Sequence, residues 1–92
     1  MRMENRVVLI TGGAAGIGRA TAEKFVAEGA TVVIADVNEE AGAATVAALG
    51  HGASFNKVNV IDRAAAQAWV DGVVERLGRI DAPINNAGIV RA

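Results

Sequence analysis

Residues 7–20 read VVLITGGAAGIGRA and decide the fold. Residues 6–11 form a short apolar run that ends in glycines, which is typical of a strand buried on both faces. Residues 16–28 then place apolar side chains at helical spacing, and Gly29 follows where a helix is expected to stop. The stretch therefore predicts a strand, a glycine-rich turn and a helix.

The rest of the chain repeats this alternation. Strands are predicted over residues 31–36, 53–60 and 79–85, the third of these with a proline inside it. Helices are predicted between them, over residues 39–49 and from 63 to 77. Their boundaries are marked by N-cap residues and by terminal glycines: Asn38, Gly50, Asp62 and Gly78.

Strands that alternate with helices predict an α/β fold with a parallel sheet and right-handed crossovers. The order β-α-β-α-β-α-β is that of half a doubly wound Rossmann sheet plus one strand, with expected strand order 3-2-1-4. The first two helices are expected on one face of the sheet and the third on the other. Residues 1–92 are thus interpreted as a single half-domain.

Composition excludes several classes of function. The chain has 92 residues, a net charge of −1, no cysteine and one histidine. The charge balance gives no basic footprint for nucleic acid or membrane lipid, and no apolar run is long enough to span a membrane. His51 lies between two glycines without nearby ligands, so no metal site is expected. The sequence predicts a cytoplasmic protein.

The glycines after the first strand have separate physical roles. Gly12 lets the chain turn sharply, Gly16 leaves room for backbone N–H groups to reach a pyrophosphate, and Gly18 allows close packing of helix on strand. The N-terminus of the following helix offers unpaired donors and the positive end of its dipole. This turn is therefore a candidate phosphate-binding loop; a plain turn is the alternative.

Asp36 is the second candidate binding residue. It ends the second strand at a spacing suited to an acid that accepts hydrogen bonds from both hydroxyls of an adenosine ribose. A carboxylate there repels a 2′-phosphate, and Ala14, Ala15 and Val37 supply no cation to attract one. NAD is therefore expected in preference to NADP. A solvated acid or a cap for the next helix is the alternative interpretation.

Three motifs give the chain a resemblance to a known family. TGGAAGIG at residues 11–18, GRID at 78–81 and NNAG at 85–88 occur in the order found in the short-chain dehydrogenase/reductase family. The glycine pattern G-x-x-x-G-x-G is this family's variant of the dinucleotide fingerprint. The resemblance covers nearly the whole chain and implies a Rossmann fold that binds a nicotinamide dinucleotide.

The resemblance also assigns binding roles to particular residues. Asn85 would help to fix the sheet, and Thr11 would tie the first loop to the NNAG segment. Asn59 stands where the family more often has aspartate. The cofactor-binding residues implied by the family pattern are Gly12, Gly16, Ile17, Gly18, Asp36, Asn59, Val60, Asn86, Ala87 and Gly88.

The catalytic residues of the family have no match in these 92 residues. The family uses a Tyr as acid/base, a Lys four residues later, and a Ser that orients the substrate, but the chain contains no Tyr and its only Ser, Ser54, opens the third predicted strand. Without a proton donor, hydride transfer lacks its partner step. The expectation is an NAD-binding half-domain that holds the ADP-ribose moiety and has no catalytic residue.

Several alternatives remain open at this point. The chain is interpreted as a reductase fragment or a redesigned half-domain; its binding loop could be vestigial, or another chain could supply the catalytic half. Pro83 is expected on an edge strand, because proline cannot donate to a ladder. An uncovered sheet face and the third helix, with Trp69 in the core or interface, predict a homodimer.

Overall fold

The computed structural model describes residues 4–12, 16–59 and 61–85 of the chain. Strands and helices alternate as predicted, and a short 3-10 helix that the sequence did not indicate precedes the third strand. The elements are β1 (Val7–Thr11), α1 (Gly16–Ala27), β2 (Thr31–Asp36), α2 (Glu39–Leu49), η1 (Gly50–Gly52), β3 (Ala53–Lys57), α3 (Arg63–Leu77) and β4 (Ala82–Asn85).

The described strands form one parallel sheet in the order β3-β2-β1-β4, which confirms the predicted topology. Val8 lies opposite Val32 of β2 on one side and opposite Ala82 of β4 on the other. The two central strands, β1 and β2, are buried along nearly their whole length. This burial explains their continuous apolar sequence, because helices cover both faces of a parallel sheet of this kind.

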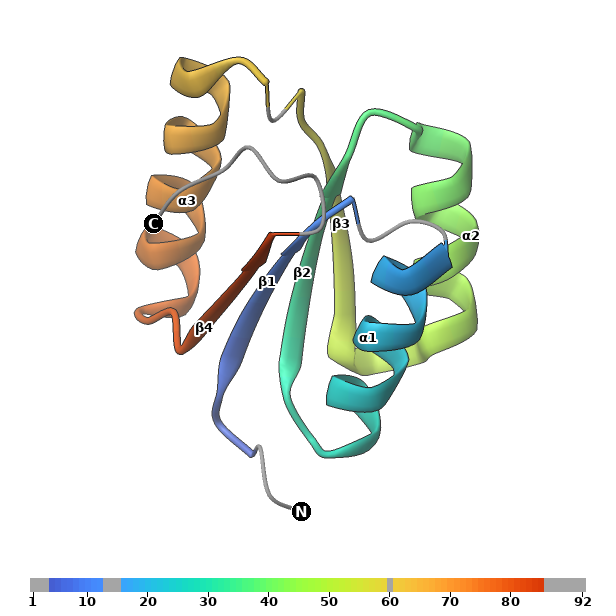
Figure 1. Cartoon of the computed structure of the whole chain (residues 1–92). Helices are drawn as coiled ribbons and strands as arrows, with labels where there is room; N and C mark the ends of the chain where they lie inside the picture. The colour runs from blue at the N-terminus through green and yellow to red at the C-terminus, as the bar shows by residue number, and fades with distance from the viewer. Residues whose placement is uncertain (1–3, 13–15, 60, 86–92) are drawn as a thin grey trace.

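Helices α1 and α2 cover one face of the sheet and α3 covers the other (Figure 1). Successive side chains of a strand point to opposite faces, so β1 and β2 each supply both cores. The α1/α2 face buries Val8, Ile10, Val32 and Ile34 with Ala22 and Ala30. The α3 face buries Val7, Leu9, Val33 and Ala35 with Trp69 and Val73.

The predicted helix caps are confirmed. The Asn38 Oδ1 atom accepts a hydrogen bond from the backbone N–H of Ala41 at 2.9 Å. The Asp62 Oδ1 atom accepts one from Ala65 at 3.2 Å. Gly78 adopts the left-handed conformation, with φ of 82°, and its N–H donates to the carbonyl of Val74. These bonds satisfy backbone groups that helix ends leave without partners.

Two strands are shorter than the sequence indicated. Beyond Lys57 the chain turns: the Asn59 Oδ1 atom accepts the N–H of Ile61 at 3.1 Å. Before Ala82, the Asp81 carboxylate accepts the N–H of Val7 at 2.7 Å. In both places a short polar side chain bonds to the backbone at the strand end, an alternative to further strand pairing. Hydrophobic pattern alone does not reveal this competition.

Pro83 lies on β4 opposite Leu9 of β1. Within the described residues, β4 pairs with β1 alone, so this strand is an edge of the sheet as the proline predicts.

Candidate functional site

The candidate site lies at the carboxyl edge of the sheet, where β1, β2 and β3 end. Parallel strands bring their carboxyl ends to one edge, and ligands of open α/β sheets bind in the crevice there. The backbone N–H of Gly12, just after β1, donates to the carbonyl of Ala35 in β2 at 2.8 Å. The glycine turn and the end of β2 are therefore in direct contact.

Gly12 has the backbone conformation that its predicted role requires. Its φ is 67°, in the left-handed region where a Cβ atom is unfavourable. Thr11, immediately before it, is buried at 3% exposure and lies opposite Ala35 and Asn85 in the two flanking strands. Strand β1 is thus buried up to its last residue. The position that follows it, Gly12, has a backbone conformation that glycine adopts more readily than other residues.

Helix α1 begins at Gly16, and Gly18 in its first turn is buried. Ile17 lies in the same turn. The short connection from β1 places the helix N-terminus at the carboxyl edge of the sheet (Figure 1). A helix start has unpaired N–H donors and a positive dipole end, which together favour a phosphate group. The arrangement fits the pyrophosphate of a dinucleotide.

Asp36 ends β2 beside the glycine turn and is half-buried. Its Oδ1 atom accepts the N–H of Asn38 at 3.2 Å. Lys57 lies directly opposite it in β3, a neighbour that the linear sequence did not reveal. The Lys57 ammonium is 3.8 Å from a carboxylate oxygen of Glu39. One cation and two carboxylates therefore surround this corner of the site.

Asn59, another of the predicted cofactor-binding residues, follows β3. It is exposed at the end of the segment that follows β3, and its Oδ1 atom is engaged by Ile61. The same segment is tied to β2, because the N–H of Val58 donates to the carbonyl of Asp36 at 3.1 Å. Val60, Asn86, Ala87 and Gly88 lie outside the described residues.

A cluster of charges around Asp81 lies at the opposite edge of the sheet, where β1 and β4 begin. Asp81 contacts Arg79 and lies 3.6 Å from Arg6, and both approach the same Oδ1 atom. The hydrogen bond from Arg79, together with that from the Val7 N–H, lowers the pKa of Asp81 below the usual aspartate value of 3.8. Asp81 therefore joins β4 to β1 as a structural anion, away from the glycine turn.

Neither a metal site nor a membrane span is found in the described part of the chain. None of its helices combines the length and the apolar content needed to cross a bilayer. No group of three His, Cys, Asp or Glu side chains is arranged there to hold a metal ion.

Comparison with known proteins settles the family. Residues 6–92 match the profile of the family described as short chain dehydrogenase. The chain belongs to this short-chain dehydrogenase family. Membership implies a nicotinamide dinucleotide as the cofactor, and the glycine turn, helix start and Asp36 of this short-chain dehydrogenase chain fit such a group.

Individual relatives agree with this assignment. The chain is 46% identical over 89 residues to sorbitol dehydrogenase from Cereibacter sphaeroides, covering 97% of this chain and 35% of the relative. It is 44% identical over 94 residues to 3beta-hydroxysteroid dehydrogenase from Mediterraneibacter gnavus, covering 99% and 34%. The short-chain dehydrogenase chain thus spans about a third of the length of these relatives.

Solved structures share the fold as well. A short chain dehydrogenase from Bacillus anthracis superimposes with a TM-score of 0.87 at 32% identity, over 91% of this chain and 35% of that one. Levodione reductase superimposes with a TM-score of 0.83 at 41% identity, over 89% and 34%. The similarity in both sequence and structure runs through the β-α-β-α-β-α-β unit.

Proposed function

We propose that residues 1–92 form a half-domain that binds the adenosine and pyrophosphate part of NAD. The supporting observation is the contact between the glycine turn and the end of β2, where the Gly12 N–H bonds to the carbonyl preceding Asp36. It brings a helix N-terminus and a carboxylate together at one edge. The residues proposed to contact the cofactor are Gly12, Gly16, Ile17, Gly18, Asp36, Asn59, Val60, Asn86, Ala87 and Gly88.

Asp36 is proposed to select NAD over NADP. Its carboxylate accepts hydrogen bonds from ribose hydroxyls and repels a phosphate in their place. Lys57 lies opposite Asp36 and is the nearby cation that could favour a phosphate, but its ammonium faces Glu39. The balance of charge at this corner therefore favours an unphosphorylated ribose.

Isothermal calorimetry on the 92-residue chain tests this proposal. NAD and ADP-ribose should bind equally well, with a dissociation constant of about 1 mM or lower, because the proposed contacts leave the nicotinamide half free. NADP should bind at least about tenfold more weakly, the loss expected when a hydrogen bond to a charged group is replaced by repulsion.

Three variants sharpen the test. Asp36→Asn should weaken NAD binding and narrow its advantage over NADP, whereas Asp71→Asn, an equal charge change on the exposed face of α3, should leave both affinities unchanged. Lys57→Gln, added to Asp36→Asn, should weaken the binding of NADP again. Absence of binding by NAD and ADP-ribose at several millimolar would instead support a vestigial loop.

We further propose that these 92 residues alone transfer no hydride. They contain no Tyr, and their single Ser lies at the start of β3. Incubation with NAD and polyol or hydroxysteroid substrates, chosen from the names of the relatives, should yield no NADH. If a polypeptide with the remaining two-thirds of a relative restores NADH production, the catalytic residues come from that part.

The exposed apolar residues of α3 support a proposal that the chain associates as a homodimer. Val74 and Leu77 of α3 remain 44% and 39% exposed, and among the described elements α3 is the helix that covers this face of the sheet. Exposed apolar surface of this kind favours association. Light scattering should give the mass of a dimer, with Val74→Glu shifting it to a monomer; a monomeric mass at high protein concentration would contradict the proposal.

A further inference from the structure

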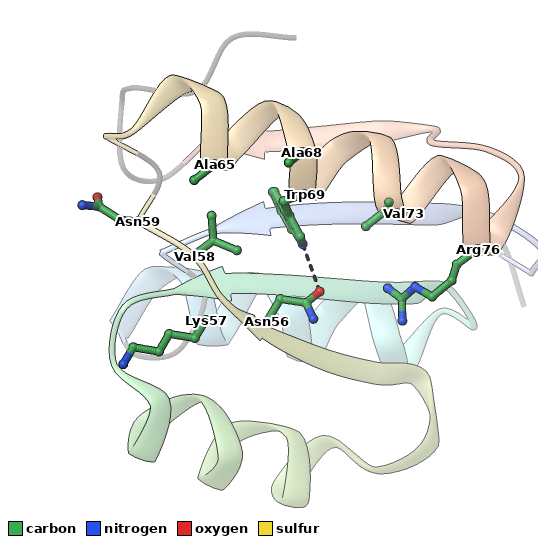
Figure 2. A pocket seen from close by; sticks show the side chains of 10 residues that line it. Asn56, Lys57, Val58, Asn59, Ala65, Ala68, Trp69, Val73 and Arg76 are labelled. Carbon is green, nitrogen blue, oxygen red and sulfur yellow. Dashed lines mark hydrogen bonds between the residues drawn. The ribbon is translucent and has the colours of Figure 1, made fainter.

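A groove runs along α3 on the side that faces β3 (Figure 2). It is lined by the end of β3, the segment that follows it and one side of α3, and its volume is about 690 Å³. Pockets for small ligands in proteins have volumes of this order. The groove opens beside β3, which is an edge strand within the described sheet.

Small residues on α3 create the groove, and Trp69 forms its floor. Ala65, Ala68 and Gly72 line it at helical spacing, and they leave space where larger side chains would fill the gap between helix and sheet. Trp69 is 8% exposed, and its indole N–H donates to Oδ1 of Asn56 at 3.0 Å. This bond fixes the apolar floor before any ligand arrives.

Near Trp69 and the end of α3, the side chains of Asn56 and Arg76 offer hydrogen-bond donors to the groove. The Oδ1 atom of Asn56 already accepts the indole N–H. The other polar group of this amide is Nδ2, which is a donor. The Arg76 side chain extends from α3 toward the sheet (Figure 2), and it forms no ion pair within the described part of the chain. None of the described residues that line the groove carries a carboxylate.

Lys57 also borders the groove but does not contribute its charge there. Its side chain points toward α2, where the ammonium meets Glu39 at 3.8 Å. The positive charge of the groove therefore comes from Arg76, at the end of α3 opposite to Asn59. An occupant that complements this surface carries an anion at one end and an apolar body along Trp69 and Val73.

We propose that this groove binds a small organic carboxylate with an apolar body. The carboxylate accepts hydrogen bonds from Arg76 and from Nδ2 of Asn56, and the apolar body covers Trp69, Val73 and Gly72. Guanidinium groups match carboxylates in both charge and geometry, which favours this class over neutral or cationic ligands.

The proposed carboxylate site is separate from the proposed nucleotide site. Ala65 and Arg76 are eleven positions apart on α3, and a helix rises 1.5 Å per residue, so the two ends of the groove are about 16 Å apart. A ligand at the Arg76 end leaves Asn59 and the glycine turn accessible. Octanoate and NAD should therefore bind simultaneously and independently.

The experiment uses octanoate and octanamide, which differ in charge but share one apolar chain. Trp69 is the only tryptophan and the chain has no tyrosine, so intrinsic fluorescence reports on the groove alone. Octanoate should change this fluorescence in a saturable manner and bind about tenfold more tightly than octanamide, as expected for hydrogen bonds to a charged group.

Variants locate the site. Arg76→Gln should abolish the preference for octanoate, whereas Arg63→Gln, the same change at the opposite end of α3 and outside the groove, should keep it. Asn56→Asp keeps an oxygen that can accept the Trp69 N–H but places a negative charge beside the ligand. It should therefore weaken the binding of octanoate more than that of octanamide. Circular dichroism checks that each variant folds.

Three results would overturn the carboxylate site. One is equal affinity for octanoate and octanamide, which indicates apolar contact alone. Another is equal loss of octanoate binding in Arg76→Gln and Arg63→Gln, which indicates attraction to net charge. The third is displacement of octanoate by ADP-ribose, which would assign the groove to the nucleotide. Failure of NAD to bind, by contrast, affects only the proposed function.

Discussion

The two faces of the sheet present similar aliphatic side chains to helices that cover them to different extents. On one face, Val8, Ile10, Val32 and Ile34 lie under two helices. On the other, Val7, Leu9, Val33 and Ala35 lie under α3, the one helix on that side in the described part of the chain. The first face is closed, and the second keeps a groove beside β3.

Glycines on the two faces show the consequence. A Cβ atom added to Gly42 of α2 would lie 2.3 Å from a ring atom of Phe55, so the Phe55 ring of β3 packs directly against the α2 backbone. A Cβ atom added to Gly72 of α3 meets nothing within 4 Å. The same residue type therefore permits close packing on the closed face and lines open space on the other.

The largest effect is expected from Gly42→Ala on the closed face. Its methyl group would overlap the Phe55 ring, so the ring or α2 must shift, which should destabilise the protein by about 3 kcal/mol. Urea unfolding followed by circular dichroism measures the loss. A cost below that of an ordinary surface substitution would show that α2 moves freely, and the contrast between the faces would disappear.

Val32→Ala and Val33→Ala compare the faces on one strand. Both residues are fully buried and adjacent in β2, but Val32 faces α1 and α2 whereas Val33 faces α3. A cavity costs more where its surroundings cannot relax, so we expect losses of about 2.5 kcal/mol for Val32→Ala and about 1.5 kcal/mol for Val33→Ala. Equal losses in urea unfolding would mean that both faces are equally rigid.

Asp81, in the connection from α3 to β4, should give a smaller, pH-dependent effect. Its pKa in the folded state is lowered by Arg79 and by the Val7 N–H. The stabilisation is therefore complete well above pH 3.8, the usual aspartate pKa that applies to the unfolded chain, and is lost as pH falls through the lower folded pKa.

Unfolding of Asp81→Asn across pH measures this contribution. The variant should be less stable than the native chain near neutral pH, and the difference should shrink in acid. Asp71→Asn is the control, because it removes the same charge from an exposed residue of α3 and should leave the contribution of Asp81 in place. A constant difference across pH would assign the effect of Asp81→Asn to shape and not to charge.

The smallest effect has the opposite sign. Gly72→Ala on α3 adds a methyl group in open space and removes a flexible residue from a helix, which should stabilise the protein by about 0.5–1 kcal/mol. Thermal unfolding detects a gain of this size. Loss of stability would mean that this side of α3 is covered in solution, and dimerisation would then be examined in the same variant.

Local signals predicted most of the fold. The apolar run before Gly12, the caps Asn38 and Asp62 and the terminal glycine at 78 each act over a few residues, and the structure confirms them. The strand ends near Asn59 and Asp81 were predicted less well. There, a side chain bonds to backbone, in the case of Asp81 to Val7 from the far end of the sequence.

The sequence predicted the motifs of the candidate site, but not the side chains that other strands and helices bring next to those motifs. Gly12 and Asp36 follow from strand ends and from the conformations that a tight turn demands. The position of Lys57 beside Asp36 depends on the register of β3 against β2, which no local pattern specifies. The ion pair of Lys57 with Glu39 likewise joins two elements.

The sequence by itself determined the alternation of elements, the parallel sheet and the family, because these depend on periodicity, caps and short motifs. Only the tertiary structure decided how tightly each face is packed. Gly42 against Phe55 and Trp69 against Asn56 are contacts between elements distant in the chain. Their geometry depends on how each helix docks on the sheet, and the chain's local preferences leave that docking undetermined.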